Sequence, residues 1–375
     1  MYAIRAGLGE SPTGRHCSRI AGRPLLPSPQ VSASDSHSPR LPGRRVSLIG
    51  GAGFIGHALA LELIRRGALV EVLDGLQVNN LLEYATLRDK ETRDLYTRII
   101  QQRLDLLHGA DVHVDVQDAR DYHALSRSLG RFQPDVIVQL AAVAHAGKSN
   151  KDPFSTFDHS LRTLENALDF TRGRDGLERF VYFSSSMVYG NFQSESIDES
   201  HPLEPIGIYG ALKLAGEKLV IAYNQVFDLP FTIIRPSALY GPGCVSRRIS
   251  QVFIENAFAG ERLRVDGDGE ERIDFSYIND VVDGICRAID SPAGRNETFN
   301  ITAGGARSIN DLVRIMRAHF PALEVETVPR DELRPFRGTL SIDKARELLG
   351  YEPAVPLEEG MARYIEWYRE LFAGN

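Results

Sequence analysis

A glycine-rich turn near the start of the chain constrains the fold more than any other feature. Residues 46–49 form a short uncharged apolar run, which is typical of a buried parallel strand. The run leads directly into residues 50–56, which read GGAGFIG, and apolar residues with helical spacing follow in residues 57–66. A second apolar run, residues 69–73, ends in Asp74. Strand, turn, helix and strand within about 30 residues predict a dinucleotide-binding unit.

The glycines of this GxxGxxG turn have separate roles. Gly50 permits a tight turn, Gly53 lets the backbone approach a pyrophosphate at the helix N-terminus, and Gly56 allows the helix to pack closely on the sheet. Asp74 lies 74 − 53 = 21 residues after Gly53, where a carboxylate can accept hydrogen bonds from the adenosine ribose. The same carboxylate repels a 2′-phosphate, and no arginine follows in Gly75-Leu76. We therefore expect NAD rather than NADP.

Further apolar runs follow at helix-length intervals, and they cover residues 112–116, 136–140, 180–183 and 231–234. Strands separated by helical lengths predict an α/β fold with a doubly wound parallel Rossmann sheet. Ligands bind at the carboxyl ends of the strands in such sheets. The side chains expected at these ends are those of Asp74, Asp118, Ala141, Ser185 and Arg235.

Ser185, Tyr209 and Lys213 form a candidate catalytic set. Tyr209 and Lys213 are four residues apart, so on a helix they share one face. A cation beside a phenol favours the phenolate, so we expect Lys213 to lower the pKa of Tyr209 from about 10 toward neutrality. The phenolate can then take a proton from a substrate hydroxyl, to which Ser185 can hydrogen-bond.

Two segments do not follow the alternation of strands and helices. Residues 1–43 are rich in Ser, Pro, Gly and Arg and have no sustained apolar period, so we expect a disordered leader. A start site placed too far upstream, or a basic targeting arm, would give the same pattern. Residues 79–108 form a long polar helical stretch, which is a helix of the sheet layer, a subunit contact or a lid.

The composition excludes several classes of protein. No apolar run approaches the roughly 20 residues that span a bilayer. The net charge of −7 gives no global field for holding a polyanion, so we expect no nucleic-acid partner. Cys17, Cys244 and Cys286 are far apart and form no CxxC pair, so no disulfide framework or zinc site is indicated. We expect a cytoplasmic protein that binds no membrane and no metal.

Taken together, the motifs resemble those of the extended short-chain dehydrogenase/reductase family, in its nucleotide-sugar epimerase/dehydratase branch. The resemblance covers about residues 45–370. The matching segments are residues 50–56, 140–142, 184–190, 209–213, 235–236, 239–242, 267–269, 274–278, 349–353 and 367–368.

The resemblance implies a tightly held NAD and a nucleotide diphosphate sugar as the substrate. It implies an NAD-binding Rossmann domain over residues 44–240 and a smaller, partly interleaved α/β substrate domain over residues 241–375. We also expect a homodimer. The implied cofactor contacts are Gly50, Gly53, Phe54, Ile55, Gly56, Asp74, Asp118, Ala141, Ala142, Tyr209 and Lys213.

Substrate contacts are expected from Ser149, Ser186, Arg248 and Arg272. The family's arginine before Asp-Phe is Ile273 here, and Arg272 is adjacent but can face the other way, since neighbouring strand residues alternate. Arg248 is therefore the better candidate for the diphosphate, although it can equally be a solvated helix start. His145, after the fourth strand, and His159, at a position where the family has Asn, carry little weight.

Two departures from the family pattern narrow the reaction. Sugar 4,6-dehydratases of this branch have Asp-Glu after the catalytic Ser or Thr, whereas Ser186 and Met187 stand here and cannot do acid–base work. The leading interpretation is therefore C4 epimerisation through a 4-keto intermediate. The alternatives are a dehydratase, a ketosugar reductase or a steroid-type dehydrogenase on this scaffold, or a non-catalytic NAD-sensing regulator.

Overall fold

The computed structural model describes residues 41–174, 176–331 and 333–373. Most of the expected leader lies outside these residues. Residues 41–43, which we assigned to the leader, pack against the turn that follows the first helix. Leu41 is fully buried, and its backbone N–H donates to the carbonyl of Arg66. The packed part of the chain therefore begins before the boundary expected at residue 44.

A seven-stranded sheet forms the centre of the fold, in the order β12-β7-β5-β4-β1-β2-β3. All six pairings are parallel. The order runs outward in both directions from β1 and β4, so the topological switch point, where such sheets bind ligands, lies between these two strands. The strands are β1 (Arg45–Ile49), β2 (Leu69–Asp74), β3 (His113–Val116), β4 (Val136–Gln139), β5 (Arg179–Phe183), β7 (Phe231–Arg235) and β12 (Glu297–Asn300).

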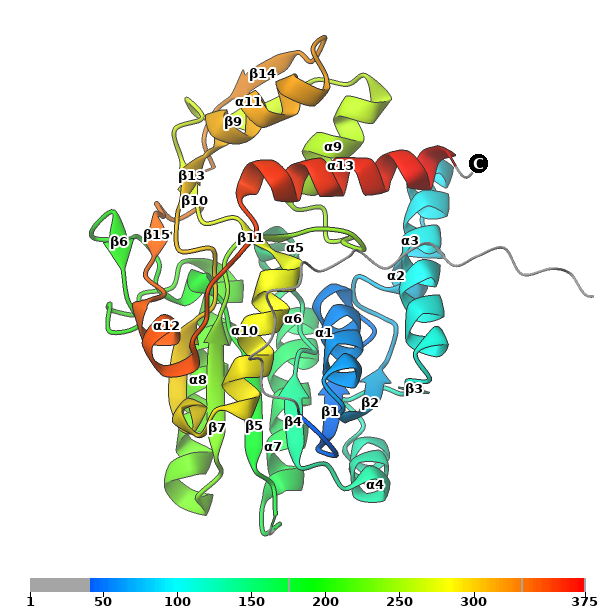
Figure 1. Cartoon of the computed structure of the whole chain (residues 1–375), viewed down its shortest axis with the longest axis vertical. Helices are drawn as coiled ribbons and strands as arrows, with labels where there is room; N and C mark the ends of the chain where they lie inside the picture. The colour runs from blue at the N-terminus through cyan, green and yellow to red at the C-terminus, as the bar shows by residue number, and fades with distance from the viewer. Residues whose placement is uncertain (1–40, 175, 332, 374–375) are drawn as a thin grey trace, which may run out of the picture. The chain divides into compact units, whose positions relative to one another are not determined.

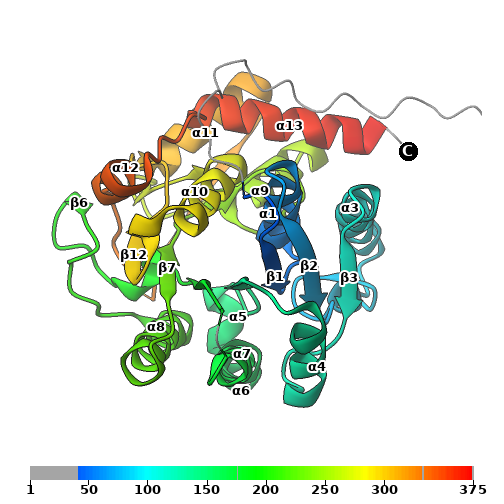
Figure 2. The ribbon, with the colours of Figure 1, turned by 60° about the horizontal axis from the view of Figure 1, so that its bottom comes forward.

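Helices cover both faces of this sheet (Figure 2). One face carries α1 (Phe54–Arg65), α3 (Lys90–Gly109) and α10 (Ile278–Asp290). The other carries α4 (Tyr122–Phe132), α7 (Thr163–Thr171) and α8 (Gly207–Phe227). Because both faces are covered, the central strands need apolar residues on both sides, which explains their uncharged runs. The predicted doubly wound parallel sheet is confirmed.

The polar stretch 79–108 forms the short helix α2 (Leu81–Tyr84) and the 20-residue helix α3. The side chain of Asp89 caps α3 by accepting from the backbone N–H of Thr92. One face of α3 is buried through Tyr96, Ile99, Ile100, Arg103 and Leu107. α3 lies beside α1, so of the three alternatives the helix of the sheet layer is confirmed (Figure 2).

Most of the chain after β7 lies beyond the carboxyl edge of the sheet (Figure 1). β12 and α10 return to the layers of the sheet, and α12 (Asp343–Leu349) packs on both, so the expected division at residue 240 stays a prediction. The remaining elements of this part are β8 (Leu239–Tyr240), α9 (Ile249–Ala259), β9 (Leu263–Asp266), β10 (Arg272–Ile273), β11 (Ser276–Tyr277), β13 (Arg307–Ser308), α11 (Ile309–His319), β14 (Val325–Val328), β15 (Thr339–Leu340) and α13 (Leu357–Ala373), with a 3₁₀ turn at Pro292–Gly294.

Short elements complete the fold around the carboxyl ends of β4 and β5. They are α5 (Ala146–Lys151), α6 (Pro153–Phe157), a π-helical turn at Asp158–Arg162, a 3₁₀ turn at Ser186–Val188 and β6 (Ser196–Ile197), which pairs with β15.

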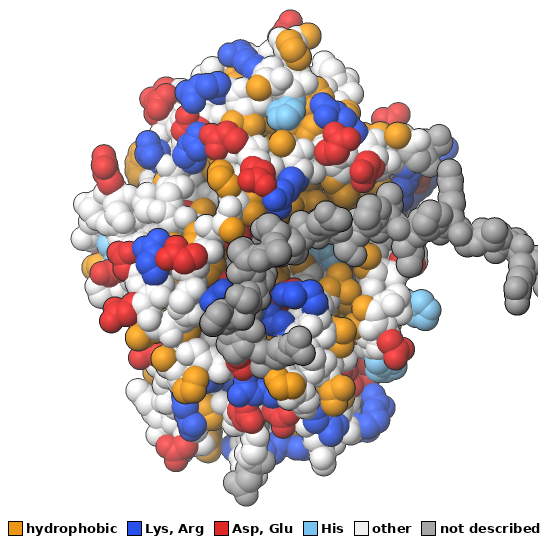
Figure 3. Space-filling model, viewed as in Figure 1, with side chains coloured by type: hydrophobic (Ala, Val, Ile, Leu, Met, Phe, Trp, Pro, Cys, Tyr) orange, Lys and Arg blue, Asp and Glu red, His pale blue; other side chains and the backbone are white. Residues whose placement is uncertain are grey.

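The described residues include no helix whose length and apolar content would suit a membrane crossing. On the face shown in Figure 3, lysine and arginine side chains lie among aspartate and glutamate side chains. The described side chains visible on this face therefore form no continuous basic surface of the kind that a nucleic acid requires.

Candidate active site

The glycine turn is built where β1, β2 and β4 end together. Gly50 has a φ of +81°, and its backbone N–H donates to the carbonyl of Leu73 over 2.7 Å. A Cβ at residue 50 would come within 2.6 Å of the backbone nitrogen of Ala141, so only glycine fits. A Cβ at Gly56 would lie 2.5 Å from the Cα of Gly51. Gly56 thus lets α1 pack against the turn itself, rather than against the sheet as we expected.

Asp74 holds this turn in place. Its Oδ2 accepts from the backbone N–H of Ala52 over 3.0 Å, and its Oδ1 accepts from that of Leu76 over 2.7 Å. Burial raises the pKa of the Asp74 carboxyl, and these two backbone hydrogen bonds oppose the rise. Each carboxylate oxygen retains a second lone pair for a ribose hydroxyl. The geometry therefore fits the cofactor role expected for Asp74.

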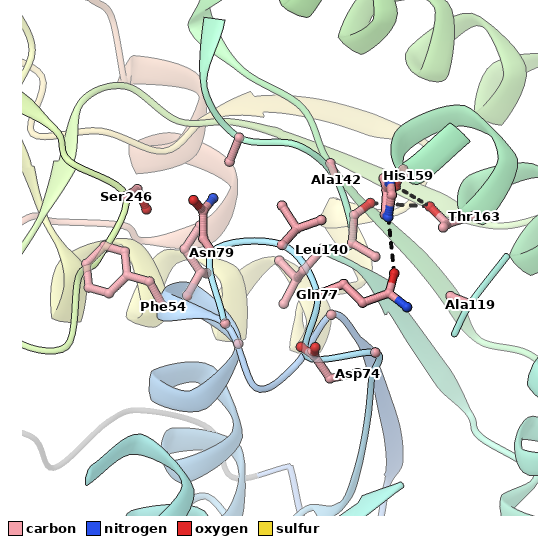
Figure 4. A pocket seen from close by; sticks show the side chains of 18 of the residues that line it. Phe54, Asp74, Gln77, Asn79, Ala119, Leu140, Ala142, His159, Thr163 and Ser246 are labelled. Carbon is pink, nitrogen blue, oxygen red and sulfur yellow. Dashed lines mark hydrogen bonds between the residues drawn. The ribbon is translucent and has the colours of Figure 1, made fainter. Parts of the chain in front are cut away.

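A pocket opens at the switch point, over the N-terminus of α1 (Figure 4). All the residues expected to contact the cofactor line this pocket, except Tyr209 and Lys213. The pocket is lined by Gly50, Gly53, Phe54, Ile55, Gly56, Leu73, Asp74, Gly75, Gln77, Val78, Asn79, Asp118, Ala119, Leu140, Ala141, Ala142, Ala144, His159, Thr163, Val245, Ser246 and Arg248.

A hydrogen-bonded network of polar side chains closes one side of the pocket. Arg120 pairs with Asp118 over 2.6 Å, and chiefly this hydrogen bond lowers the pKa of Asp118 to about 2. Gln77 donates to Asp118 over 3.2 Å. On its other side, the Oε1 of Gln77 lies 3.1 Å from the Nε2 of His159, as Figure 4 shows. The network fixes Asp118 as a carboxylate at the pocket wall.

Ser185 and Tyr209 are brought together by a close approach between α8 and the loop after β5. A Cβ at Gly210 would lie 2.7 Å from the carbonyl oxygen of Met187, so glycine lets α8 reach this loop. The Ser185 side chain lies close enough to the Tyr209 phenol to act on its pKa, and its hydroxyl accepts from the backbone N–H of Met187 over 3.2 Å. The serine and the phenol can thus share one substrate hydroxyl, while their catalytic role stays a prediction.

The expected effect of Lys213 on Tyr209 is wrong for this structure. Burial raises the pKa of the Tyr209 phenol, while the Arg248 guanidinium and the hydrogen bond from Ser185 act in the lowering direction. The Lys213 ammonium instead donates to the carbonyl of Phe183 over 2.6 Å. Burial lowers the pKa of Lys213 to about 8, and the nearby Glu217 carboxylate opposes this. Lys213 is therefore fixed one helical turn beyond Tyr209 without bonding to it.

A buried ion pair lies one further turn along α8. Glu217 accepts from Arg235 through both carboxylate oxygens, over 2.9 and 2.7 Å, and it also accepts from the hydroxyl of Ser184. Arg235 donates in addition to the hydroxyl of Tyr189 over 2.9 Å. This network joins α8 to the carboxyl ends of β5 and β7, and so it holds the helix that carries Tyr209 and Lys213.

Of the four expected substrate contacts, only Arg248 lines the pocket. Its Nε is buried and has no hydrogen-bond partner among the described residues. Arg272 is exposed and donates to the carbonyl of Ala306 over 2.6 Å, so it points elsewhere. Ser149 is fully buried, and its hydroxyl is bound to the carbonyl of His145. Ser186 is buried, and its backbone N–H donates to Pro236 over 2.9 Å.

The sequence reasoning missed several residues that line the pocket. Gln77 and Asn79 follow Asp74 in a loop that lacks a recognisable motif. Val245 and Ser246 lie just after the segment 239–242, so that matching segment was the available signal for this loop. His159 was noted but given little weight, and it lies in the pocket wall through its bond to Gln77.

A glycine turn that tolerates no Cβ and a carboxylate at the end of β2 define a dinucleotide-binding Rossmann protein. The sequence profile of the NAD dependent epimerase/dehydratase family matches residues 46–302. The chain belongs to this family, within the extended short-chain dehydrogenases/reductases, and NAD is its cofactor.

The similar proteins include both epimerases and dehydratases. A UDP-glucose 4-epimerase from Mycolicibacterium smegmatis is 30% identical over 87% of this chain and 98% of its own. The structure of a UDP-glucuronic acid 4-epimerase from Bacillus cereus, solved with UDP-glucuronic acid and NAD, has a TM-score of 0.78 at 25% identity, covering 87% and 99% of the two chains. A dTDP-glucose 4,6-dehydratase from Streptomyces venezuelae has a TM-score of 0.76 at 27% identity, covering 87% and 97%.

Proposed function

We propose that this protein is an NAD-dependent nucleotide-sugar 4-epimerase that works through a 4-keto intermediate. The observation that carries the proposal is the juxtaposition of Ser185 and Tyr209, with Ser185 followed in the chain by two residues without acid–base capacity, Ser186 and Met187. The pair can handle the proton of one hydroxyl. The two residues that follow offer no group that could remove a second proton or expel water.

In this proposal, Ser185 and Tyr209 bind the hydroxyl at C4 of the sugar and transfer its proton. Tyr209 takes this proton as the alcohol becomes a ketone, and it returns the proton when the ketone is reduced on its other face. Ser185 holds the same oxygen by a hydrogen bond. The positive charge of Arg248 favours the phenolate against the cost of its burial. When bound, NAD supplies the reversible acceptance of the C4 hydride, so the reaction has no net redox change.

A cluster of arginines supports a diphosphate substrate. Arg248 lines the pocket with an unpartnered Nε, among the described residues. Partial burial lowers the pKa of the half-buried His145, and the Arg248 charge adds to this effect. Arg337 lies near enough to both Arg248 and Arg334 for their charges to interact. Arginine guanidinium groups match phosphate oxygens in geometry and charge. We propose that this cluster binds the diphosphate of a nucleotide sugar.

The proposal favours epimerisation over dehydration, although similar proteins carry both names. In a dehydration, a base must remove a proton at C5 while an acid assists the loss of the C6 hydroxyl. Met187 has no ionisable group, and the buried Ser186 hydroxyl is a poor acid and a poor base. Neither side chain can perform these steps.

The test is turnover of a panel of UDP-, dTDP-, GDP- and CDP-sugars in deuterated water. We expect one 4-epimer pair to interconvert with no deuterium on carbon and no cofactor added beyond what the protein carries. A dehydratase or a deprotonating 5-epimerase would place solvent deuterium at C5 or C6. That result would overturn the 4-epimerase proposal and leave the family assignment standing.

We also propose that the chain forms a homodimer. Support comes from large exposed apolar side chains on α6 and α8, two helices that pack on each other. Phe154 on α6 is 83% exposed, and Phe157 on α6 and Val226 and Phe227 at the end of α8 are exposed as well. Sedimentation analysis of the full chain at micromolar concentration tests this, and a monomer mass would contradict it.

A further inference from the structure

An arginine is buried beside the cofactor turn without a counter-ion. Arg103 lies on α3 and is 1% exposed. Its Nη1 donates a weak, 3.4 Å hydrogen bond to the carbonyl of Ala52, in the middle of the glycine turn. Its Nε and Nη2 are buried and have no hydrogen-bond partner among the described residues. Within those residues no carboxylate forms an ion pair with it.

Such a residue is costly to the fold. An unpaired buried charge is among the least favourable features of a protein interior, and burial lowers the pKa of the Arg103 guanidinium to about 10. The surrounding face of α3 is apolar, with Tyr96, Ile99, Ile100 and Leu107. An apolar side chain would therefore suit this position better if the protein had only to fold.

The packing of Arg103 does not require its charge. The carbonyl of Ala52, which it contacts, also accepts from the Nδ2 of Asn80 over 3.3 Å. The carbonyl of Ala52 would thus keep a hydrogen-bond donor if the guanidinium were removed. Asp74 is the carboxylate whose charge acts on Arg103, and both oxygens of that carboxylate already accept backbone N–H groups.

The position of Arg103 matches the place where NAD brings negative charge. The guanidinium contacts the turn at the N-terminus of α1, a 12-residue helix whose N-cap Gly53 supplies no side-chain cap. Free N–H groups and the helix dipole favour an anion at such an end. On its other side, Arg103 faces the loop that carries Val245 and Ser246 into the pocket, since a Cβ at Gly243 would lie 3.6 Å from its Cγ.

We propose that Arg103 is the buried counter-charge for the pyrophosphate of NAD, acting across the glycine turn from behind the pocket wall. The residue is thus kept for cofactor binding at a cost to the stability of the cofactor-free fold. The inference concerns the cofactor alone, so it stands or fails independently of the 4-epimerase proposal.

An alternative is that Arg103 acts through Asp74, whose ionised form its charge also favours. The two cases differ in the part of NAD whose binding depends on Arg103. Asp74 is expected to hold the adenosine ribose, whereas the counter-charge acts on the phosphates. Adenosine and ADP share the ribose and differ in the phosphates, so their binding separates the two cases.

The experiment measures ADP and adenosine binding to the full chain freed of bound nucleotide, by calorimetry, for R103M, R103K and R98M. We expect R103M to weaken ADP binding by about tenfold or more and to change adenosine binding by less than about twofold. R103K keeps the charge and should retain most of the affinity for ADP. Arg98 lies on the same helix and donates to the carbonyl of Leu371, so R98M should change neither ligand.

The thermal stability of nucleotide-free R103M gives a second readout, which we expect to equal or exceed that of the unmutated chain. Equal losses for ADP and adenosine would assign Arg103 to Asp74 or to the shape of the turn, and would overturn the proposal. Unchanged ADP binding would overturn it as well. Failure of R103M to fold would also contradict it, because the proposal holds that folding does not need this charge.

Discussion

The ammonium group of Lys213 donates a 2.6 Å hydrogen bond to the backbone carbonyl of Phe183, the last residue of β5. This bond anchors the middle of α8 to the strand whose end carries Ser185. It also fixes a buried cation one turn beyond Tyr209, with Glu217 as the carboxylate that favours its charge. Lys213 is thus an integral part of the packing between helix and sheet.

K213M should change how the stability of the nucleotide-free chain depends on pH. The folded-state pKa of Lys213, about 8, lies below its ordinary value of 10.5, so the unfolded chain binds more protons between these values. Below pH 8 the buried charge of Lys213 therefore lowers the free energy of unfolding by its full amount. This destabilisation disappears as the pH rises to 10.5. We expect the free energy of unfolding of K213M, relative to the unmutated chain, to fall by about 3 kcal/mol from pH 7 to pH 10.5.

Urea denaturation at a series of pH values measures this difference. Lys218 is exposed on the same helix, so K218M serves as the matched control and should follow the unmutated chain at every pH. A constant difference between K213M and the unmutated chain would mean that Lys213 titrates as it does in water.

The main parts of the fold could be predicted because they depend on local patterns. Residues close together in the sequence are enough to identify the two apolar runs, 46–49 and 69–73, and the turn between them. Arg103 could not be predicted in this way, since its burial depends on where α3 packs against α1. Its charge also interrupts the apolar spacing that marks a buried face.

The candidate site was predicted in part for the same reason. Ser185 and Tyr209 come from matching segments, and the structure brings them together. The pKa of Tyr209 was not predictable, because the spacing to Lys213 says nothing of burial or of the competing carbonyl of Phe183. The substrate contacts of Ser149 and Arg272 stay predictions, because the directions of these side chains depend on short local elements that no periodicity reveals.

E217Q should weaken both the fold and the site. The substitution leaves the buried Arg235 without its carboxylate, and breaking such a pair costs about 3–5 kcal/mol of unfolding free energy. The exposed pair Arg131–Asp115 offers a control, since R131A should cost less than about 1 kcal/mol. Chemical denaturation measures both variants. A loss below about 1 kcal/mol for E217Q would contradict a stabilising role for the ion pair.

The same variant has a kinetic readout. Glu217 raises the pKa of Lys213, so its removal should lower that pKa further below 8. If turnover needs the charged lysine, the alkaline limb of the pH profile should move to lower pH in E217Q. An unmoved limb would separate the role of Glu217 in packing from any role in the site.

D74A should reduce both the affinity for NAD and its selectivity over NADP. The loss of a charged hydrogen-bond acceptor corresponds to about 1–3 kcal/mol. Part of this loss reflects the turn, because Asp74 also accepts from Ala52 and Leu76. The ratio of NAD to NADP affinity isolates the repulsion of the 2′-phosphate. Calorimetry measures it, and equal affinity of the unmutated chain for both cofactors would contradict the assignment.

Y209F tests the proton acceptor with little change in volume. The substitution removes the hydroxyl beside Ser185, while Lys213 keeps its bond to Phe183 and the glycine turn is untouched. We therefore expect kcat to fall by about 10²–10⁴-fold, the range for the loss of a general base, while NAD remains bound. Tyr223 lies on the same helix outside the pocket, so Y223F should turn over normally. Product separation gives kcat, and the absorbance of nucleotide released by acid gives the NAD content. Turnover of Y209F within about threefold of the unmutated chain would remove Tyr209 as the base, whereas loss of NAD as well would show that the phenol also holds the cofactor.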